Sequence, residues 1–242
     1  YKFYPTEDRT KLAFKLGEVD SIQNIYTSEP FDTWNTVSVN ENTNYEQVVT
    51  VFFNAGVEPF SGNNTLRQAL DYAIDKGSFD APRALGPVSP TSWAYNPQVK
   101  PYAYDKERAE ELIGEAEGVE IKLVTTPVLL SVAESIAEDW EAVGIKTVVQ
   151  VSSVIPTDYH AYLAILDIPK DPDQYSIWHS TQTASNISNF SDARIDKLLE
   201  DGRTELNLEE RKRIYLDFQR FLLEELPAAF LYHPVTYEVS RN

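Results

Sequence analysis

The sequence predicts an α/β fold, in which strands and helices alternate along much of the chain. Apolar residues recur at helical spacing in several segments that begin at a capping residue or end at glycine. Residues 119–126, 131–143 and 145–151 have the patterns of a strand, a helix and a second strand. Together they have the size of one right-handed crossover unit with parallel strands.

Five helices are predicted from this spacing, over residues 8–17, 65–77, 104–116, 130–144 and 207–226. In the first helix, Leu12, Ala13 and Leu16 are expected on the buried face, and Gly17 is expected to end the helix. Arg67, in the second helix, lies on the face opposite Leu70. We therefore expect Arg67 to be structural and to bridge to an acidic residue.

Helix starts are also marked by polar residues. Asp105 is the expected N-cap of the third helix, whose buried face includes Ala116. Asn207 is followed three residues on by Glu210, which is a variant of the capping box. Five strands are predicted between the helices, at residues 46–54, 119–126, 145–151, 161–166 and 228–235.

A proline-rich segment over residues 82–101 predicts an extended surface loop, since proline interrupts both helices and central strands. Its aromatic residues need a surface to pack against, so we expect the loop to lie on a lobe of the protein.

The composition excludes several classes of function. The chain has 21 basic and 38 acidic residues, a net charge of −17, which disfavours nucleic acid and anionic membrane as partners. It has no cysteine, which excludes disulfides, zinc–thiolate sites and thiol nucleophiles. It also has no methionine, and we expect it to be a processed or excised piece of a longer protein. No apolar run reaches the length of a membrane span.

The segment AYLAILDIPKDPDQYSIWHS, residues 161–180, is the candidate site. Asp167 directly follows a predicted strand, where α/β sheets gather ligands. Asp167 could accept hydrogen bonds from a cationic ligand, with Tyr175 and Trp178 as an apolar wall, or it could cap a turn in a solvated loop. Lys170 could neutralise part of its charge.

A metal site is not favoured. The aspartates of this segment lack the glycine and the downstream glutamate of a calcium loop. The three histidines are far apart in sequence and lie in no HExxH helix. The sequence also has no GxSxG, GxxxxGKS/T or GxGxxG motif, so we expect no enzyme and no cofactor, although a carboxylate-dependent hydrolase stays as a weaker alternative.

The order of segments resembles the carboxy-terminal half of family 5 extracellular solute-binding proteins, the peptide- and nickel-binding components of ABC importers. The resemblance is carried by KLAFKLGEVDSI, VFFNAGVEPFSGNNTLRQALDYAIDK, YAYDKERAEELIGEAEG, AEDWEAVGIKTVVQ, DPDQY, NISNFSDARIDKLLEDGR and EERKRIYLDFQRFLLEELPAAFLYHP, in that order. It implies a lobe of the type II periplasmic-binding-protein fold, with a mixed sheet, flanking helices and a partner lobe that closes on the ligand.

The resemblance also implies a domain division and site residues. Residues 1–56 would be a remnant of the first lobe with the crossover strand, 57–226 the second, ligand-binding lobe, and 227–242 a return strand. Asp167 would pair with the free amino group of a peptide, with Asp171 as the fallback. Further ligand contacts would come from Tyr175, Trp178, His179 and Gln182, and less strongly from Trp93. Trp178 could equally belong to the core.

The function implied is capture of oligopeptides outside the cytoplasm, for delivery to ABC permease subunits. We expect a monomer without a cofactor, either periplasmic or at the cell surface, lipid-anchored or secreted. The same fold could instead bind a nickel chelate, an oligosaccharide or haem.

Overall fold

The computed structural model describes three stretches of the chain, residues 1–114, 118–155 and 157–242. They form two compact units, each with its own sheet and its own apolar core. Unit 1 comprises Tyr1–Asn44 and His233–Asn242, and unit 2 comprises Tyr45–Tyr232.

Unit 1 contains a helix and a three-stranded antiparallel sheet. Its elements are α1 (Glu7–Lys15), β1 (Ser21–Ile25), the 3-10 turn η1 (Phe31–Thr33), β2 (Val37–Thr43) and β8 (Val235–Arg241). β8 pairs with β1 on one side and β2 on the other. The strands β1 and β2 were not predicted from the sequence, because a polar segment such as VSVNENT has little intrinsic preference for a strand.

The buried face of α1 agrees with the prediction at Ala13, which is 3% exposed, and differs from it elsewhere. Phe14 is buried, whereas Leu12 is 43% and Leu16 is 66% exposed. The rings of Phe14 and Phe31 meet edge to face, 5.1 Å between centroids, so the larger aromatic surface takes the core position. The predicted end of the helix is confirmed, since Gly17 follows it with a φ of +74°.

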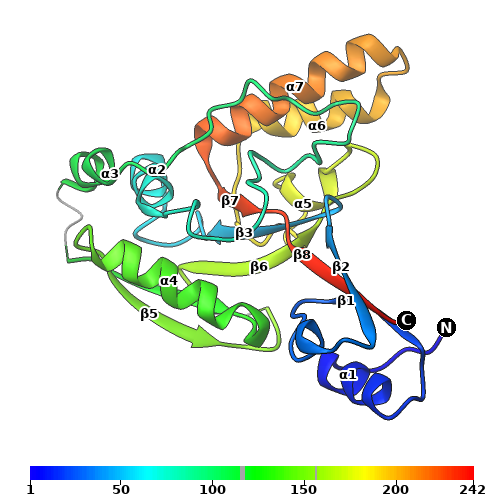
Figure 1. Ribbon diagram of the computed structural model, residues 1–242. Helices are drawn as coiled ribbons and strands as arrows, with labels where there is room; N and C mark the ends of the chain where they lie inside the picture. The colour runs from blue at the N-terminus through cyan, green and yellow to red at the C-terminus, as the bar shows by residue number, and fades with distance from the viewer. Residues whose placement is uncertain (115–117, 156) are drawn as a thin grey trace. The chain divides into compact units, whose positions relative to one another are not determined.

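A mixed sheet in the order β5-β4-β6-β3-β7 forms the framework of unit 2 (Figure 1). Its strands are β3 (Gln47–Phe53), β4 (Glu120–Thr125), β5 (Lys146–Val151), β6 (Ala161–Asp167) and β7 (Ala228–Tyr232). β4 is parallel to both β5 and β6, and β3 is antiparallel to both β6 and β7. The predicted parallel crossover unit is therefore confirmed as β4, α4 and β5.

The helices of unit 2 are α2 (Asn64–Ala73), α3 (Lys106–Ile113), the 3-10 turn η3 (Pro127–Leu129), α4 (Leu130–Glu141), α5 (Tyr175–Trp178), α6 (Ala193–Thr204) and α7 (Leu208–Glu225). Asp105 and Asn207 cap α3 and α7 as predicted. Glu205, rather than Glu210, accepts the N–H of Asn207. Ala116, expected on the buried face of the α3 segment, lies outside the described residues.

The proline-rich segment packs on α7, but it is less extended and less exposed than predicted, since it consists largely of turns and bends and buries Ala84, Val88 and Ala94. Gln219 of α7 donates from Nε2 to the carbonyl of Ala94 at 2.8 Å and accepts the N–H of Asn96 at 3.0 Å. Tyr102 is buried, and its hydroxyl donates to an α7 carbonyl at 2.9 Å. These hydrogen bonds fix the segment against α7 without regular secondary structure.

Trp178 lies in the core of unit 2. The sequence had left open whether it contacts the ligand or belongs to the core. Its side chain is 1% exposed, and its ring lies 5.8 Å from Phe52 and 6.1 Å from Phe230 between centroids. Its Nε1 donates to Oε1 of Gln174 at 2.7 Å, so its polar atom is satisfied internally.

Candidate ligand-binding site

Asp167 is the last residue of β6, and its side chain is exposed. It pairs in register with Gln47, whose Nε2 donates to Oδ1 of Asp167 at 2.7 Å. Lys170 does not neutralise it, because Nζ of Lys170 lies 3.5 Å from Oε1 of Glu46. Within the described part of the chain, no ion pair to Asp167 is formed, so its carboxylate is available to a cationic ligand.

The backbone edge of β6 beside Asp167 is also available. β4 pairs with β6 only up to Thr125, which lies opposite Leu163. β6 continues for four more residues, to Asp167, and these pair with β3 on the other side only, as far as the described residues go. Because a free strand edge presents unpaired N–H and C=O groups, an extended chain can add to it.

Asp171 is part of an ion pair that ties its loop to α7. Arg211 donates to both carboxylate oxygens, at 2.7 Å from Nη2 and 2.9 Å from Nη1. These hydrogen bonds hold the pKa of Asp171 below its usual value. Trp93 belongs to the same group, since the Arg211 guanidinium lies 5.6 Å from its ring centroid. Trp93 is 36% exposed.

Tyr175 and His179 form a second group, at the two ends of α5. Their rings stack with centroids 4.0 Å apart, and the Arg203 guanidinium lies over the Tyr175 ring, 4.5 Å from its centroid. Gln182, half-buried in the following turn, donates to Thr181 at 3.3 Å.

The imidazole of His179 is buried, 4% exposed. Its Nδ1 accepts the backbone N–H of Thr181 at 3.2 Å. Nε2 lies 3.6 Å from Oε1 of Glu200 and has no hydrogen-bond partner among the described residues. Because so little of the ring reaches the surface, its contacts are with the chain.

The predicted site residues are therefore distributed over three places. Asp167 stands at the carboxyl end of β6, Asp171 and Trp93 share Arg211, and the residues from 175 to 182 surround α5. Sequence reasoning missed Gln47, the partner of Asp167. The two residues are 120 positions apart, so no local pattern could have linked them.

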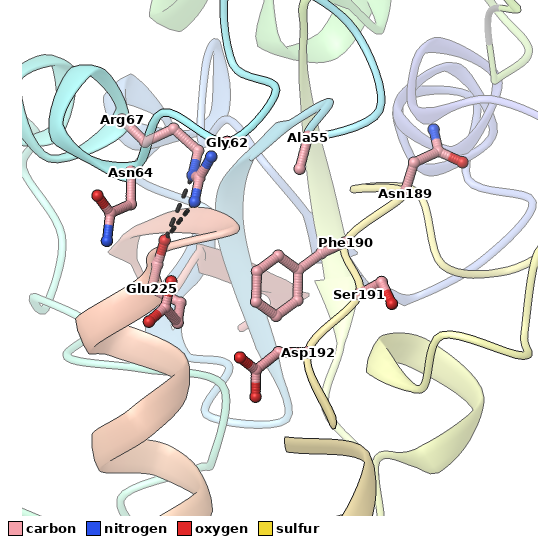
Figure 2. Close-up of a pocket in the computed structure, with 9 residues that line it drawn as sticks. All are labelled: Ala55, Gly62, Asn64, Arg67, Asn189, Phe190, Ser191, Asp192 and Glu225. Atoms are coloured by element: carbon pink, nitrogen blue, oxygen red, sulfur yellow. Dashed lines mark hydrogen bonds between the residues drawn. The ribbon is translucent and has the colours of Figure 1, made fainter. Parts of the chain in front are cut away.

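A pocket of about 310 Å³ lies elsewhere in unit 2 (Figure 2). It is lined by Ala55, Gly62, Asn64, Arg67, Asn189, Phe190, Ser191, Asp192 and Glu225. Ala55 lies two residues past the end of β3, whereas Asp167 pairs with the first residue of that strand. The pocket is thus at the opposite end of the strand from Asp167.

Arg67 in this pocket is structural, as expected, but its partners are carbonyl oxygens and not an acid. It donates to Phe60 at 2.7 Å, to Glu225 at 2.8 Å and to Leu226 at 3.1 Å (Figure 2 shows the bonds to Glu225). Burial lowers the pKa of Arg67 to about 10. Asp192 is likewise engaged, since it caps α6. Arg67 therefore joins the ends of two helices, and Asp192 caps the start of α6.

Neither a metal cluster nor a membrane helix is found in the described residues. No group of three or more His, Cys, Asp or Glu side chains there could hold a metal ion. No described helix has both the length and the apolar character that crossing a bilayer requires.

The family model of the bacterial extracellular solute-binding proteins, family 5, middle region, matches residues 1–186. The chain belongs to this family. The resemblance drawn from its sequence motifs is confirmed, and the family 5 chain matches the carboxy-terminal portion of its relatives. Membership also makes it one of a family of extracellular binding proteins.

Two curated relatives of this family 5 chain bind different solutes. Heme-binding protein A of Haemophilus influenzae is 28% identical over 220 residues, 78% of this chain and 40% of the relative. Di/tripeptide-binding protein 1 of Pseudomonas aeruginosa is 27% identical over 225 residues, 79% of this chain and 41% of the relative. The chain thus spans less than half the length of these relatives.

Solved structures confirm the predicted fold, a periplasmic-binding-protein lobe with a mixed sheet and flanking helices. NikZ of Campylobacter jejuni, in complex with Ni(L-His), has a TM-score of 0.87 at 24% identity and covers 100% of this chain and 56% of its own. AppA of Bacillus subtilis, in complex with a nonapeptide, has a TM-score of 0.85 at 22% identity, and the match covers 100% of this chain and 55% of AppA.

Proposed function

We propose that this family 5 chain is part of an extracytoplasmic binding protein that captures peptides for an ABC importer. Several relatives are named di/tripeptide- or oligopeptide-binding proteins. A structural neighbour from Helicobacter pylori is described as ABC transporter-associated and holds the peptide STSA. The proposed protein is a monomer that binds and releases its ligand without chemistry, and is either secreted or lipid-anchored.

The open edge of β6 beside Asp167 is the observation that favours a peptide over another solute. A peptide has its own N–H and C=O groups at the spacing of a strand, so it can pair with the four residues that β4 leaves uncovered. Haem and a nickel chelate lack this repeating backbone. Both stay as rivals, because relatives and structural neighbours that bind them share the fold.

Asp167 is proposed to hold the α-ammonium group of that peptide. Gln47 donates one hydrogen bond to the carboxylate, and the Asp167 side chain is exposed to solvent. A charge-assisted bond from an ammonium is about twice as strong as a neutral one once the ligand displaces water. We further propose that unit 2 supplies the ligand-binding lobe and that unit 1 belongs to the other lobe.

The test is a double-mutant cycle in the full-length protein. Asp167→Asn should cost about 2–5 kcal/mol of peptide affinity, measured by calorimetry. Acetylating the peptide's amino terminus should cost wild type a similar amount and cost the variant little, because the two changes remove the same interaction. Asp217→Asn, which makes the same chemical change on the exposed face of α7, should bind like wild type.

Two outcomes would refute the proposed role of Asp167. One is unchanged affinity in Asp167→Asn, and the other is an acetylation penalty that persists in the variant. Saturable binding of haem or nickel–histidine in place of peptides would favour a rival ligand. A cleaved peptide or sugar after incubation would favour the hydrolase.

A further inference from the structure

Exposed aliphatic residues lie at and just beyond the carboxyl ends of β4 and β5, and β4 is the strand that pairs with the first part of β6. Val128, Val151, Val154 and Ile155 are 53%, 44%, 71% and 55% exposed, and we call these four residues the aliphatic rim. Large apolar side chains that gather on a protein surface mark binding sites more often than isolated ones do.

The rim is an ordered part of unit 2. Val151 lies opposite Thr125 in the parallel pairing of β4 and β5, and the N–H of Ser152 donates to the Thr125 carbonyl at 2.8 Å. The Ser152 hydroxyl then donates to the carbonyl of Val154 at 2.7 Å, which closes a turn. Val128 follows β4 in η3, whose next residue, Leu129, is buried.

The rim is also free of charge, in a protein whose net charge is −17. Residues 123–133 and 147–155 contain no Asp, Glu, Lys, Arg or His. The neighbouring charges, Lys122 and Asp158, pair with each other. The rim therefore cannot neutralise a carboxylate of a ligand, and it would exclude water from an apolar side chain.

Strand geometry relates the rim to Asp167. The four residues of β6 beyond Leu163 span about 13 Å at roughly 3.3 Å per residue, so Asp167 lies that far past the level of Thr125. A peptide held at Asp167 by its amino group and running back along the open edge would reach the level of Thr125 after about four residues.

We infer that the aliphatic rim selects peptides with a large apolar side chain at about the third to fifth position from the amino terminus. This inference rests on the proposed function, since it needs a peptide anchored at Asp167. The rim then contacts the bound peptide, and not a second copy of the chain or the rest of the polypeptide.

Calorimetry on the full-length protein tests the inference, with an alanine pentapeptide as the reference. Replacing its fourth residue by leucine should tighten binding to wild type about tenfold, and replacing it by glutamate should not. Val154→Thr, which keeps the side-chain shape and adds a hydroxyl, should reduce the preference for leucine about three- to fivefold. Its affinity for the alanine peptide should change less than its affinity for the leucine peptide, because alanine buries less apolar surface.

Val148→Thr is the matched control. Val148 is 42% exposed on the same strand, three residues and about 10 Å before Val151, and its side chain therefore points to the opposite face of the sheet. It should keep the full preference for leucine. The same peptides carrying an acetylated amino terminus show whether binding still depends on Asp167.

The results separate this inference from the proposed function. If none of the peptides binds, the proposed function fails. Peptides could bind through Asp167 without wild type preferring leucine at positions three to five, or Val154→Thr could keep that preference. Either result overturns the role of the rim and leaves the proposed function standing. A changed oligomeric state or a lowered unfolding midpoint of Val154→Thr without a changed preference also overturns it, because another protein surface then covers the rim.

Discussion

Arg67→Met is expected to destabilise unit 2 by about 3 kcal/mol. The side chain of Arg67 joins the start of α2 to the end of α7 through three carbonyl oxygens, those of Phe60, Glu225 and Leu226. Arg67 is 3% exposed, so water cannot replace the lost donors. Methionine fills a similar length but donates nothing.

The magnitude follows from two opposing contributions. Each carbonyl loses a hydrogen bond from a charged donor, about 1.5–3 kcal/mol apiece, or on the order of 5–9 kcal/mol for three. Removing the guanidinium also removes the free-energy cost of burying its charge. That burial lowers the pKa of Arg67 from 12.5 to about 10. That shift corresponds to on the order of 3 kcal/mol. The net loss is therefore about 2–6 kcal/mol, with about 3 as the expected value once the helix ends relax.

Equilibrium urea unfolding of the full-length protein measures this loss. Trp140 and Trp178 are both buried in unit 2, so their fluorescence reports its unfolding. Arg213→Met is the matched control, because Arg213 is an exposed arginine of α7 whose ion pair with Glu210 should be worth less than about 0.5 kcal/mol. Equal stabilities of the two variants would refute the assigned role of Arg67.

Two further predictions concern the loop and helices around Arg211. Gly202→Ala should destabilise the protein by about 1–3 kcal/mol, although alanine favours helices, because a Cβ at this position would lie 2.8 Å from the ring of Tyr215. Thermal melts measure the loss. Gly86→Ala is the control and should be tolerated, because the nearest atom to its Cβ would be 3.5 Å away. Asp171→Asn should cost about 1 kcal/mol or less at pH 7, because the pair with Arg211 is partly exposed. Since Arg211 lowers the pKa of Asp171, the stabilisation is complete above the unfolded value of about 3.9 and is lost as the pH falls through the lower folded pKa. The difference from wild type in urea midpoints should shrink below about pH 4, and a constant difference would contradict the ion-pair assignment.

Much of the secondary structure of unit 2 could be predicted from the sequence, because its signals are local. The caps at Asp105 and Asn207 and the strand–helix–strand pattern over 119–151 each lie within a few turns of chain. The polar strands of unit 1 could not, since β8 holds β1 and β2 through pairing across almost the whole sequence. The family, too, could be identified from short motifs in their order along the chain.

Some features of the candidate site, like some of the fold, follow from the sequence, and others follow only from the tertiary structure. The sequence by itself determined that an aspartate ends a strand and that a rim segment carries no charge. Only the tertiary structure decided that Lys170 pairs with Glu46, that Trp178 is in the core, and that β4 stops short of Asp167 and leaves an edge open. Caps and periodicity depend on neighbours along the chain, whereas strand register and the choice of ion-pair partner depend on residues that are distant in sequence, such as Gln47 and Asp167 or Ser21 and Ser240.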